Sequence, residues 1–352
     1  MKKIKSVPVK YLLVFIFSVT FFYSCSDDPV SNDPVDPTYQ YDSARFSWKV
    51  DTLYGPGFFA GLWAKDTNDI FITNTFSSSL YRIQNGVKSY ISYPVNTYLG
   101  VVTGDEMNNG FVIGGILIDT LVQPFFQKFD GNSFIEIPNP QNLKQSLTFN
   151  AVFVKNENEM WIGANGYILK FDGVNLYSFQ LEDSRTKALK FFYDEFNNFK
   201  LLASIHHLDT DRTEFIIYEY TGSQWINIFS DIDSPRPLRY NIFNKYVSAA
   251  NLNTIFELTG NTLTPKVTIT PPGSGFTMDG YSFNNILVPA RKYTDFCRTS
   301  LFHWNGIKWS LELCNYWVDP TTDVYMINEN YYYVVSYNQN GTTFIMQGKK
   351  NN

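Results

Sequence analysis

The chain is poor in the residue types that most catalytic and metal sites use. Its 352 residues include only three histidines and three cysteines, and charged residues make up 17% of them, against about 25% in an average globular protein. It contains no phosphate-binding glycine loop, nucleophile elbow or calcium loop. Acidic pairs such as Glu182 and Asp183 are interpreted as solvated turn residues. These absences predict a protein with no catalytic residue, no metal site and no cofactor.

The chain also lacks a dense run of lysine and arginine beyond residue 10, and it lacks long stretches of Ala, Leu, Glu and Lys at helical spacing. From residue 11 onward, 24 basic residues stand against 33 acidic ones, a net charge of −9. Nucleic acid is therefore not expected as a partner. Aromatic residues reach 18%, with 24 Tyr and 31 Phe, and such side chains pack well on strands. The composition predicts an all-β fold.

The first 24 residues have the form of an export signal. Four lysines lie within residues 1–10, and residues 11–23 are almost wholly apolar. This apolar stretch would span roughly 20 Å as a helix, too short for a hydrocarbon core of about 30 Å. Ser24 and Cys25 follow, and the segment resembles a bacterial lipoprotein leader, in which the cysteine becomes the lipidated first residue. Phe22 stands where such motifs usually have Leu, and an ordinary signal peptide is the alternative.

The resemblance implies three regions: a signal peptide over residues 1–24, a disordered tether over 25–42 and a folded domain over 43–350. The tether is rich in Asp, Pro and Ser, which cannot bury enough apolar surface to fold. We therefore expect a protein exported and lipid-anchored to the bacterial cell envelope, at the outer membrane. Acidic residues directly after the cysteine resemble those that accompany display on the outer surface.

A repeated unit fills the folded domain, and its clearest copy covers residues 150–180. We predict four short strands there, over 151–154, 160–163, 167–171 and 175–180, with hairpin turns at Asn165-Gly166 and Asp172-Gly173. Four antiparallel strands in this order form one blade of a β-propeller. A glycine after the third strand recurs every 38 to 49 residues, a spacing typical of blades. The recurring positions are Gly86, Gly131, Gly173, Gly222, Gly260 and Gly306.

The two ends of the domain supply one more blade. Three strands are predicted over residues 323–327, 331–337 and 342–347, and the fourth is absent. Residues 45–52 alternate as a strand, with Phe46, Trp48 and Val50 on one face, and can complete this blade and close the ring. We predict an all-β, seven-bladed β-propeller of four-stranded antiparallel blades closed by the N-terminal strand. Six blades are the alternative, and a two-sheet sandwich is disfavoured by the period.

Residues 160–173, with the elements Trp-Ile-Gly and Phe-Asp-Gly, resemble the propeller repeats of periplasmic sensors in two-component regulators. The resemblance implies ligand sensing outside the cytoplasm. It does not extend to the membrane span and kinase of those sensors, so no output module is implied.

Cys297 and Cys314 flank the predicted turn at Asn305-Gly306. If that turn is a two-residue loop, the cysteines lie opposite each other in a non-hydrogen-bonded pair with Cα atoms about 4.5 Å apart, within disulfide range. An exported protein meets an oxidising compartment. We therefore predict a disulfide, which a longer turn would prevent by shifting the register; two free thiols are the alternative.

The links between second and third strands suggest a binding face. They are tight at residues 165–166 and longer over 117–123, 206–213 and 292–298, and all lie on one rim with the links between blades. Loops on a rigid scaffold often carry binding, although ordinary surface variation explains the pattern equally well. Neighbouring histidines on a strand point to opposite faces, so His206 and His207 do not suggest a metal site. The candidate ligand-binding residues are Asp119, His207, Asp211, Tyr293 and Asp295.

The sequence thus favours a non-catalytic, envelope-anchored binding or scaffold lipoprotein. Its expected partners are the membrane, through the lipid anchor, and a glycan or a cell-surface protein, recognised through one rim of the propeller. A propeller-type polysaccharide hydrolase or lyase is the alternative and would need carboxylates, or a Tyr and Arg group, at the mouth of the channel. A purely structural member of a surface complex is the third possibility.

Overall fold

The computed structural model describes residues 46–351 with internal gaps. The gaps are residues 54–58, 75–77, 106, 119–120, 139–149, 211, 235–239, 244, 250–253, 261, 269–277, 295–296, 316–318 and 338–341. In some strands only the backbone is described, at residues 59–60, 121, 231–234, 240–243, 248–249, 290–294, 297–300, 314–315, 319–323 and 337. The predicted leader, Cys25 and the tether lie outside the described residues.

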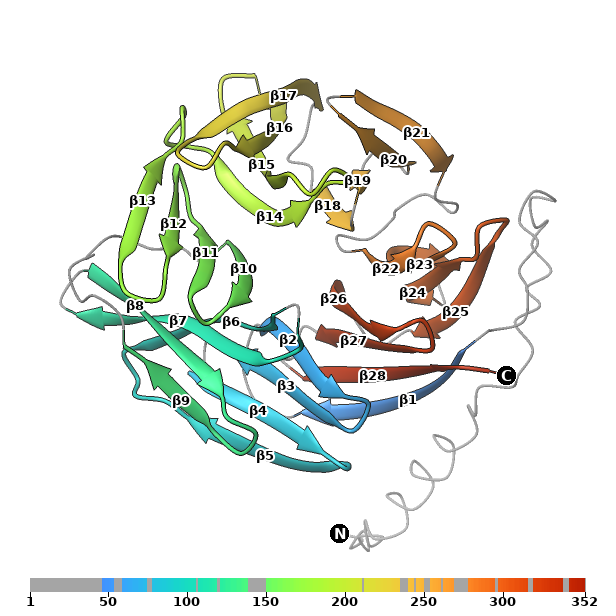
Figure 1. Ribbon diagram of the computed structural model, residues 1–352. Coiled ribbons are helices and arrows are strands. Elements are labelled where there is room, and N and C mark those ends of the chain that lie inside the picture. Colours follow the sequence, from blue (N-terminus) through green and yellow to red (C-terminus); the bar gives the residue numbers. More distant parts are fainter. Residues whose placement is uncertain are drawn as a thin grey trace, which may run out of the picture. The chain divides into compact units, whose positions relative to one another are not determined.

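The described strands form seven four-stranded antiparallel sheets arranged as the blades of a ring (Figure 1). Within a blade, the first strand lies nearest the centre and the fourth lies outermost. Blade one contains β2 (Phe59–Asp66), β3 (Asp69–Asn74), β4 (Ser79–Gln84) and β5 (Val87–Ser92). Blade two contains β6 (Thr97–Gly104), β7 (Gly110–Ile118), β8 (Leu121–Phe129) and β9 (Phe134–Ile137). Blade three contains β10 (Ala151–Asn156), β11 (Glu159–Gly163), β12 (Tyr167–Phe171) and β13 (Leu176–Gln180).

The remaining blades follow the same order. Blade four contains β14 (Lys187–Tyr193), β15 (Phe199–His207), β16 (Arg212–Tyr220) and β17 (Trp225–Ser234). Blade five contains β18 (Tyr240–Phe243), β19 (Tyr246–Ala249), β20 (Thr254–Thr259) and β21 (Thr262–Thr268). Blade six contains β22 (Asp279–Ser282), β23 (Asn285–Thr294), β24 (Cys297–Trp304) and β25 (Trp309–Asn315). Blade seven contains β26 (Asp319–Asn328), β27 (Tyr331–Tyr337), β28 (Thr343–Lys350) and, as its fourth strand, β1 (Phe46–Leu53).

The predicted fold class, blade number and closure are confirmed. β1 pairs antiparallel with β28, from Phe46 opposite Lys350 to Leu53 opposite Thr343, so the two ends of the domain share one sheet (Figure 1). On one face of β1, Phe46 is buried, Trp48 packs beside it against blade six, and Val50 is exposed. The described residues contain no apolar helix long enough to cross a bilayer.

The core lies between blades. Seven clusters of buried side chains are described, and each joins two neighbouring blades around the ring. This arrangement follows from the sequence, because a strand buried on both faces of a blade offers apolar side chains at successive positions. In β3, for example, every residue from Asp69 to Asn74 is buried.

The recurring glycines all lie in links between third and fourth strands, and all six have positive φ angles, between 57° and 107°. In blades two, three, four and six the link has four residues, and its first side chain accepts hydrogen bonds from the backbone. In blade three, Asp172 Oδ1 accepts from the amides of Val174 and Asn175. The hairpin predicted at 172–173 is present, but its link of residues 172–175 is one residue longer than the predicted strands leave, because the aspartate side chain stabilises a longer loop.

A link of four residues also changes the predicted cysteine register. Asn305 Oδ1 accepts hydrogen bonds from the amides of Ile307 and Lys308, so the link spans residues 305–308 and Trp304 lies opposite Trp309. With a bulge beyond Leu301, Cys314 comes to lie opposite Ser300. Cys297 is three residues away along β24, a stagger of about 10 Å, which exceeds the usual disulfide range. The register on which the disulfide rested is wrong, and the side chains of both cysteines lie outside the described residues.

Candidate functional site

The three links that suggested a binding rim are mostly extensions of strands. Ile118 lies opposite Leu121, and Thr294 lies opposite Cys297, so each of these links has two residues. Of the three, only the link of blade four has four residues, 208–211, between the paired His207 and Arg212. The interpretation of these segments as long loops is therefore wrong for blades two and six, where the second and third strands themselves extend further.

Of the five candidate rim residues, His207 alone has a described side chain. Asp119, Asp211 and Asp295 lie outside the described residues, and Tyr293 is described only in its backbone. The structure therefore does not test whether the five converge.

His207 is already engaged within its own blade. Its Nε2 lies 2.9 Å from Glu214 Oε2, and Glu214 also contacts the hydroxyl of Ser230. Nearby, the side chain and backbone of Arg185 hydrogen-bond to Asp183 and lower the pKa of that carboxyl to about 2. No group of three His, Cys, Asp or Glu side chains in the described part of the chain is arranged to hold a metal ion. At this rim the described side chains of Asp183, Arg185, His207 and Glu214 are engaged in hydrogen bonds with residues of the rim itself.

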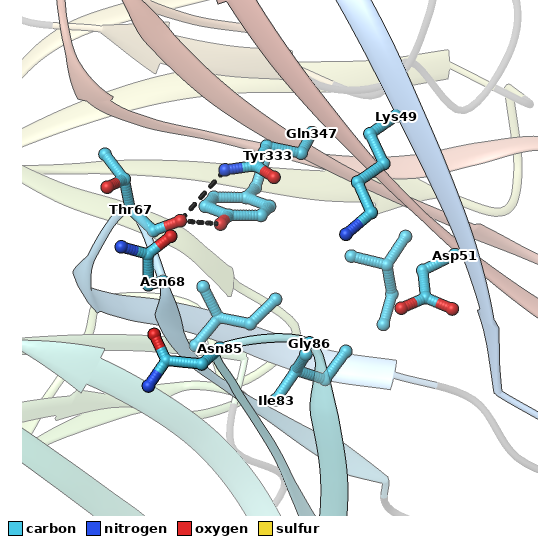
Figure 2. Close-up of a pocket in the computed structure, with 11 residues that line it drawn as sticks. Lys49, Asp51, Thr67, Asn68, Ile83, Asn85, Gly86, Tyr333 and Gln347 are labelled. Atoms are coloured by element: carbon cyan, nitrogen blue, oxygen red, sulfur yellow. Dashed lines mark hydrogen bonds between the residues drawn. The ribbon is translucent and has the colours of Figure 1, made fainter.

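A cavity of about 280 Å³ lies between blade seven and blade one (Figure 2), and we call it the closure cavity. It opens at the 67–68 and 85–86 turns of blade one. Because neighbouring strands run antiparallel, these turns lie at the opposite end of the strands from the predicted rim. The closure cavity is lined by Lys49, Asp51, Thr67, Asn68, Ile70, Ile83, Asn85, Gly86, Tyr333, Ile345 and Gln347.

The inner wall of the closure cavity is apolar and fixed. Ile70, Ile83 and Ile345 are between 2% and 7% exposed. Beside them, Tyr333 Oη and Gln347 Nε2 both donate hydrogen bonds to the carbonyl oxygen of Thr67, at 2.8 and 2.9 Å (Figure 2). Burial raises the pKa of Tyr333 well above its usual value, so its hydroxyl stays protonated as a donor. These two bonds attach blade seven to the first turn of blade one.

The charged residues of the closure cavity come from β1. Asp51 forms an ion pair with Lys88 of β5 at 2.5 Å and accepts a hydrogen bond from the backbone of Thr52. Burial by itself would raise the pKa of Asp51, but the bonds from Lys88 and Thr52 outweigh it and hold the pKa below its usual value. Lys49 forms no hydrogen bond or ion pair with a described residue, and its ammonium group points into the cavity (Figure 2).

The closure cavity exists because the interface between blades seven and one differs from other interfaces at two positions, one in each blade. In blade seven, Asp51 of the fourth strand lies opposite Ile345 of the third. The matched residue of the fourth strand is Ile137, opposite Phe126, in blade two and Phe179, opposite Ile168, in blade three. The matched residue in those blades is thus bulky and apolar. In blade three, Phe179 stacks on Trp161 with ring centroids 5.8 Å apart.

The second position is on the side of blade one. In blade one, Ile83 of the third strand lies opposite Ile70 of the second. The matched residue of the third strand in blade three is Phe171, which lies opposite Met160. Phe171 is fully buried and lies 5.0 Å from the ring of Phe126 in the preceding blade. Ile83 is smaller and leaves space at the same place. The turn beside it is open as well, since a Cβ on Gly86 would meet nothing within 4 Å, as is also true at Gly131, Gly222 and Gly260.

A second hollow adjoins the closure cavity, and we call it the side groove. It measures about 450 Å³ and shares Lys49, Thr67, Asn68 and Gln347 with the cavity. Its further lining residues are Ser47, Trp48, Tyr331 and Lys349. The Lys349 ammonium lies 5.9 Å from the centroid of the Tyr331 ring. The indole Nε1 of Trp48 is buried and has no hydrogen-bond partner in the described structure.

Sequence reasoning missed both hollows, although a signal for them was present. β1 was recognised by its apolar face, Phe46, Trp48 and Val50, and its other face was not considered. That face carries Ser47, Lys49 and Asp51 at positions that point toward blade one. Charged residues on the inward face of a closing strand indicate an interface that is not fully packed.

The comparisons with known proteins support the fold. No protein-family model and no curated protein matches the sequence. A structure of YCF48 bound to D1 peptide aligns over 88% of this chain and 98% of its own, with a TM-score of 0.60 and 11% identity. An inactive virginiamycin B lyase from Staphylococcus aureus, with quinupristin, aligns over 85% and 99%, with a TM-score of 0.55 and 10% identity. A structure of BBS1N in complex with ARL6DN aligns over 86% and 96%, with a TM-score of 0.56 and 9% identity. At these identities, the similarity shows the fold alone.

Proposed function

We propose that the protein is a non-catalytic binding propeller, held at the bacterial cell envelope through a lipidated Cys25, that binds a glycan in the closure cavity and side groove. The observation that carries this proposal is the chemistry of the accessible wall. The buried isoleucines offer little surface, so a ligand meets the amides of Asn68, Asn85 and Gln347 and the ammonium of Lys49.

This set of groups suits a saccharide. Amide side chains both donate and accept hydrogen bonds, as sugar hydroxyls do, and the half-buried ring of Trp48 offers an apolar face beside them. A cavity of about 280 Å³ falls just below the range of about 300–1,000 Å³ typical of small-molecule sites. A protein partner would instead be expected to need a larger apolar surface at the centre of its interface.

Catalysis is less well supported by the same residues. Hydrolysis of a glycosidic bond usually requires two carboxyl groups, one on each side of the bond. Among the described residues that line the closure cavity, Asp51 supplies a single carboxyl, which is paired with Lys88. The lyase among the structural neighbours shares the fold, and fold alone does not carry an activity over.

The test is a glycan-array screen of soluble protein comprising residues 26–352, which retains every strand of the ring. The decisive variant is Ile83→Phe, which places in blade one the residue that blade three has at the matched position. We expect it to fill the cavity and abolish binding. Ile135→Phe makes the same change on an exposed position of β9, and it should bind as the parent does.

Thermal unfolding of both variants establishes that they fold. If Ile83→Phe is unstable, Asn68→Ala replaces it as the test. This variant removes one amide from the cavity without changing the cavity volume greatly, and it should weaken binding. Equal glycan binding by the parent and a folded Ile83→Phe variant would place the site elsewhere. A screen with no bound glycan would refute the glycan proposal, and cross-linking in the envelope would then identify a protein partner.

The anchor is tested separately, because Cys25 lies outside the described residues. Cells fed a radiolabelled fatty acid should incorporate it into the protein, and Cys25→Ser should abolish the incorporation and release the protein from the membrane fraction. Membrane association that survives without lipid labelling would contradict the proposal.

A further inference from the structure

Lys49 differs from five other lysines on the strands of this propeller. Lys88, Lys128, Lys155, Lys200 and Lys266 each form an ion pair with a described carboxylate. Lys49 forms none, although it lies beside Asp51. Asp51 is already held by Lys88 at 2.5 Å, so the exposed Lys49 interacts with Asp51 only by longer-range attraction and its ammonium has no carboxylate within ion-pair distance among the described residues.

A second lysine lies on the same face. In the register of β1 and β28, Lys349 is opposite Ser47 and Lys49 is opposite Gln347. Lys49 and Lys349 are therefore diagonal neighbours, with Cα atoms about 7–8 Å apart. Both side chains line the side groove. Both side chains are exposed, so an anion that enters between them can bind both ammonium groups.

The charge balance of this region is opposite to that of the whole chain. Among the described residues that line the closure cavity and side groove, Lys49 and Lys349 are the basic ones and Asp51 is the one carboxylate, which is paired with Lys88 outside the lining. The complete sequence has a net charge of −5. An anion reaching the two hollows would form charge-assisted hydrogen bonds, which are roughly twice as strong as neutral ones.

We infer that the ligand of the closure cavity is an acidic saccharide, whose carboxylate or sulfate group binds between Lys49 and Lys349 while its ring lies against the amides of Asn68 and Asn85. This inference rests on the proposed glycan-binding function and specifies its ligand class. Lys49 is the residue that selects the anionic group, and Lys349 strengthens the selection from the side groove.

The experiment is isothermal titration calorimetry of the soluble protein with three probes. They are neutral xylohexaose, an oligogalacturonate that carries carboxylates, and a sulfated xylohexaose. We expect an acidic probe to bind at least about tenfold more tightly than the neutral one, with an affinity that falls as salt rises. The acidic probe that binds more tightly identifies the anionic group as a carboxylate or a sulfate.

Three variants test the assignment to residues. Lys49→Gln should weaken acidic binding by about tenfold, the effect of losing one charge-assisted bond, and Lys349→Gln should weaken it less. Lys187→Gln removes the same charge at an exposed position at the other end of the strands and should have no effect.

The outcomes separate this inference from the proposal on which it rests. If neutral and acidic probes bind equally, Lys49→Gln changes nothing and Ile83→Phe abolishes binding, the acidic preference is wrong and the glycan site stands. If no oligosaccharide binds at all, both are wrong.

Discussion

The interface between blades three and four and the interface between blades seven and one have the same strand arrangement and very different contents. In the first, the fully buried Trp161 contacts Phe179, Phe199, Tyr220 and Trp225, with ring centroids 4.7 to 5.8 Å apart. The Lys170 ammonium lies 4.9 Å from the centroid of the indole ring. This interface is filled by rings.

At the closure, the residue matched to Trp161 is Tyr333, and the residue matched to Lys170 is Gln347. Both use their polar ends to bind Thr67 of the next blade. β1 is also attached to blade six, where the buried Glu312 accepts a hydrogen bond from the backbone amide of Phe46. The closure thus combines apolar packing with specific hydrogen bonds, and it can leave a cavity open where the other interface cannot.

The largest expected effect is the loss of the ring at the centre of the aromatic interface. Trp161→Ala should reduce the free energy of unfolding by about 3–5 kcal/mol, because it removes a fully buried ring and leaves a cavity. Tyr333→Ala, at the matched position beside an existing cavity, should cost less. Urea denaturation of both variants measures the difference, and equal losses would contradict the contrast between the two interfaces.

The next effect concerns the attachment of β1. Glu312 is buried and accepts hydrogen bonds from Phe46 N and Ser310 Oγ. Glu312→Ala should destabilise the protein by about 2–4 kcal/mol, because the backbone amide and the hydroxyl would stay buried without that acceptor. Hydrogen exchange should show β1 opening first. Glu136→Ala on the exposed strand β9 is the control and should leave both readouts unchanged.

A smaller difference is expected between two turn glycines. Gly86 and Gly173 have φ angles of 80° and 91°, so Gly→Ala at either position should cost about 1–2 kcal/mol from backbone strain alone. At Gly173 the new Cβ would also lie 2.6 Å from Asn158 Oδ1, whereas at Gly86 it would enter open space. Thermal unfolding should therefore show a greater loss for Gly173→Ala. The reverse order would mean that the 85–86 turn is more tightly packed than the structure indicates.

The smallest effect concerns the ion pair at the cavity mouth. The pKa of Asp51 is lower in the folded state than its usual value, since Lys88 and Thr52 hydrogen-bond to the carboxylate. Its stabilisation is present above the unfolded pKa of about 3.9 and is lost as the pH falls through the lower folded pKa. Asp51→Asn should cost less than about 1 kcal/mol at pH 7, since the pair is partly exposed.

The difference between the parent and Asp51→Asn should disappear as the pH falls below about 4. Urea denaturation at pH 7, 5 and 3 measures it. A difference that grows toward acid would mean that the folded state raises this pKa.

Local patterns in the sequence were sufficient for the blade architecture. Alternation in residues 45–52 identified the closing strand, and the recurring glycines identified the links, because a positive φ is a property of single positions. These local patterns could not predict the length of the links. The turn at 305–308 has four residues because the Asn305 side chain accepts hydrogen bonds from two backbone amides. A two-residue turn was equally compatible with the same amino-acid sequence.

The sequence by itself therefore determined the all-β class, the number of blades and the strand that closes the ring, since these depend on periodicity and on contacts within a blade. Only the tertiary structure decided where the closure cavity lies. Its wall is made by residues as far apart as Thr67 and Gln347, 280 positions along the chain. Whether Lys49 and Asp51 face water or an unfilled interface depends on the size of Ile83 in another blade, and no local pattern contains that information.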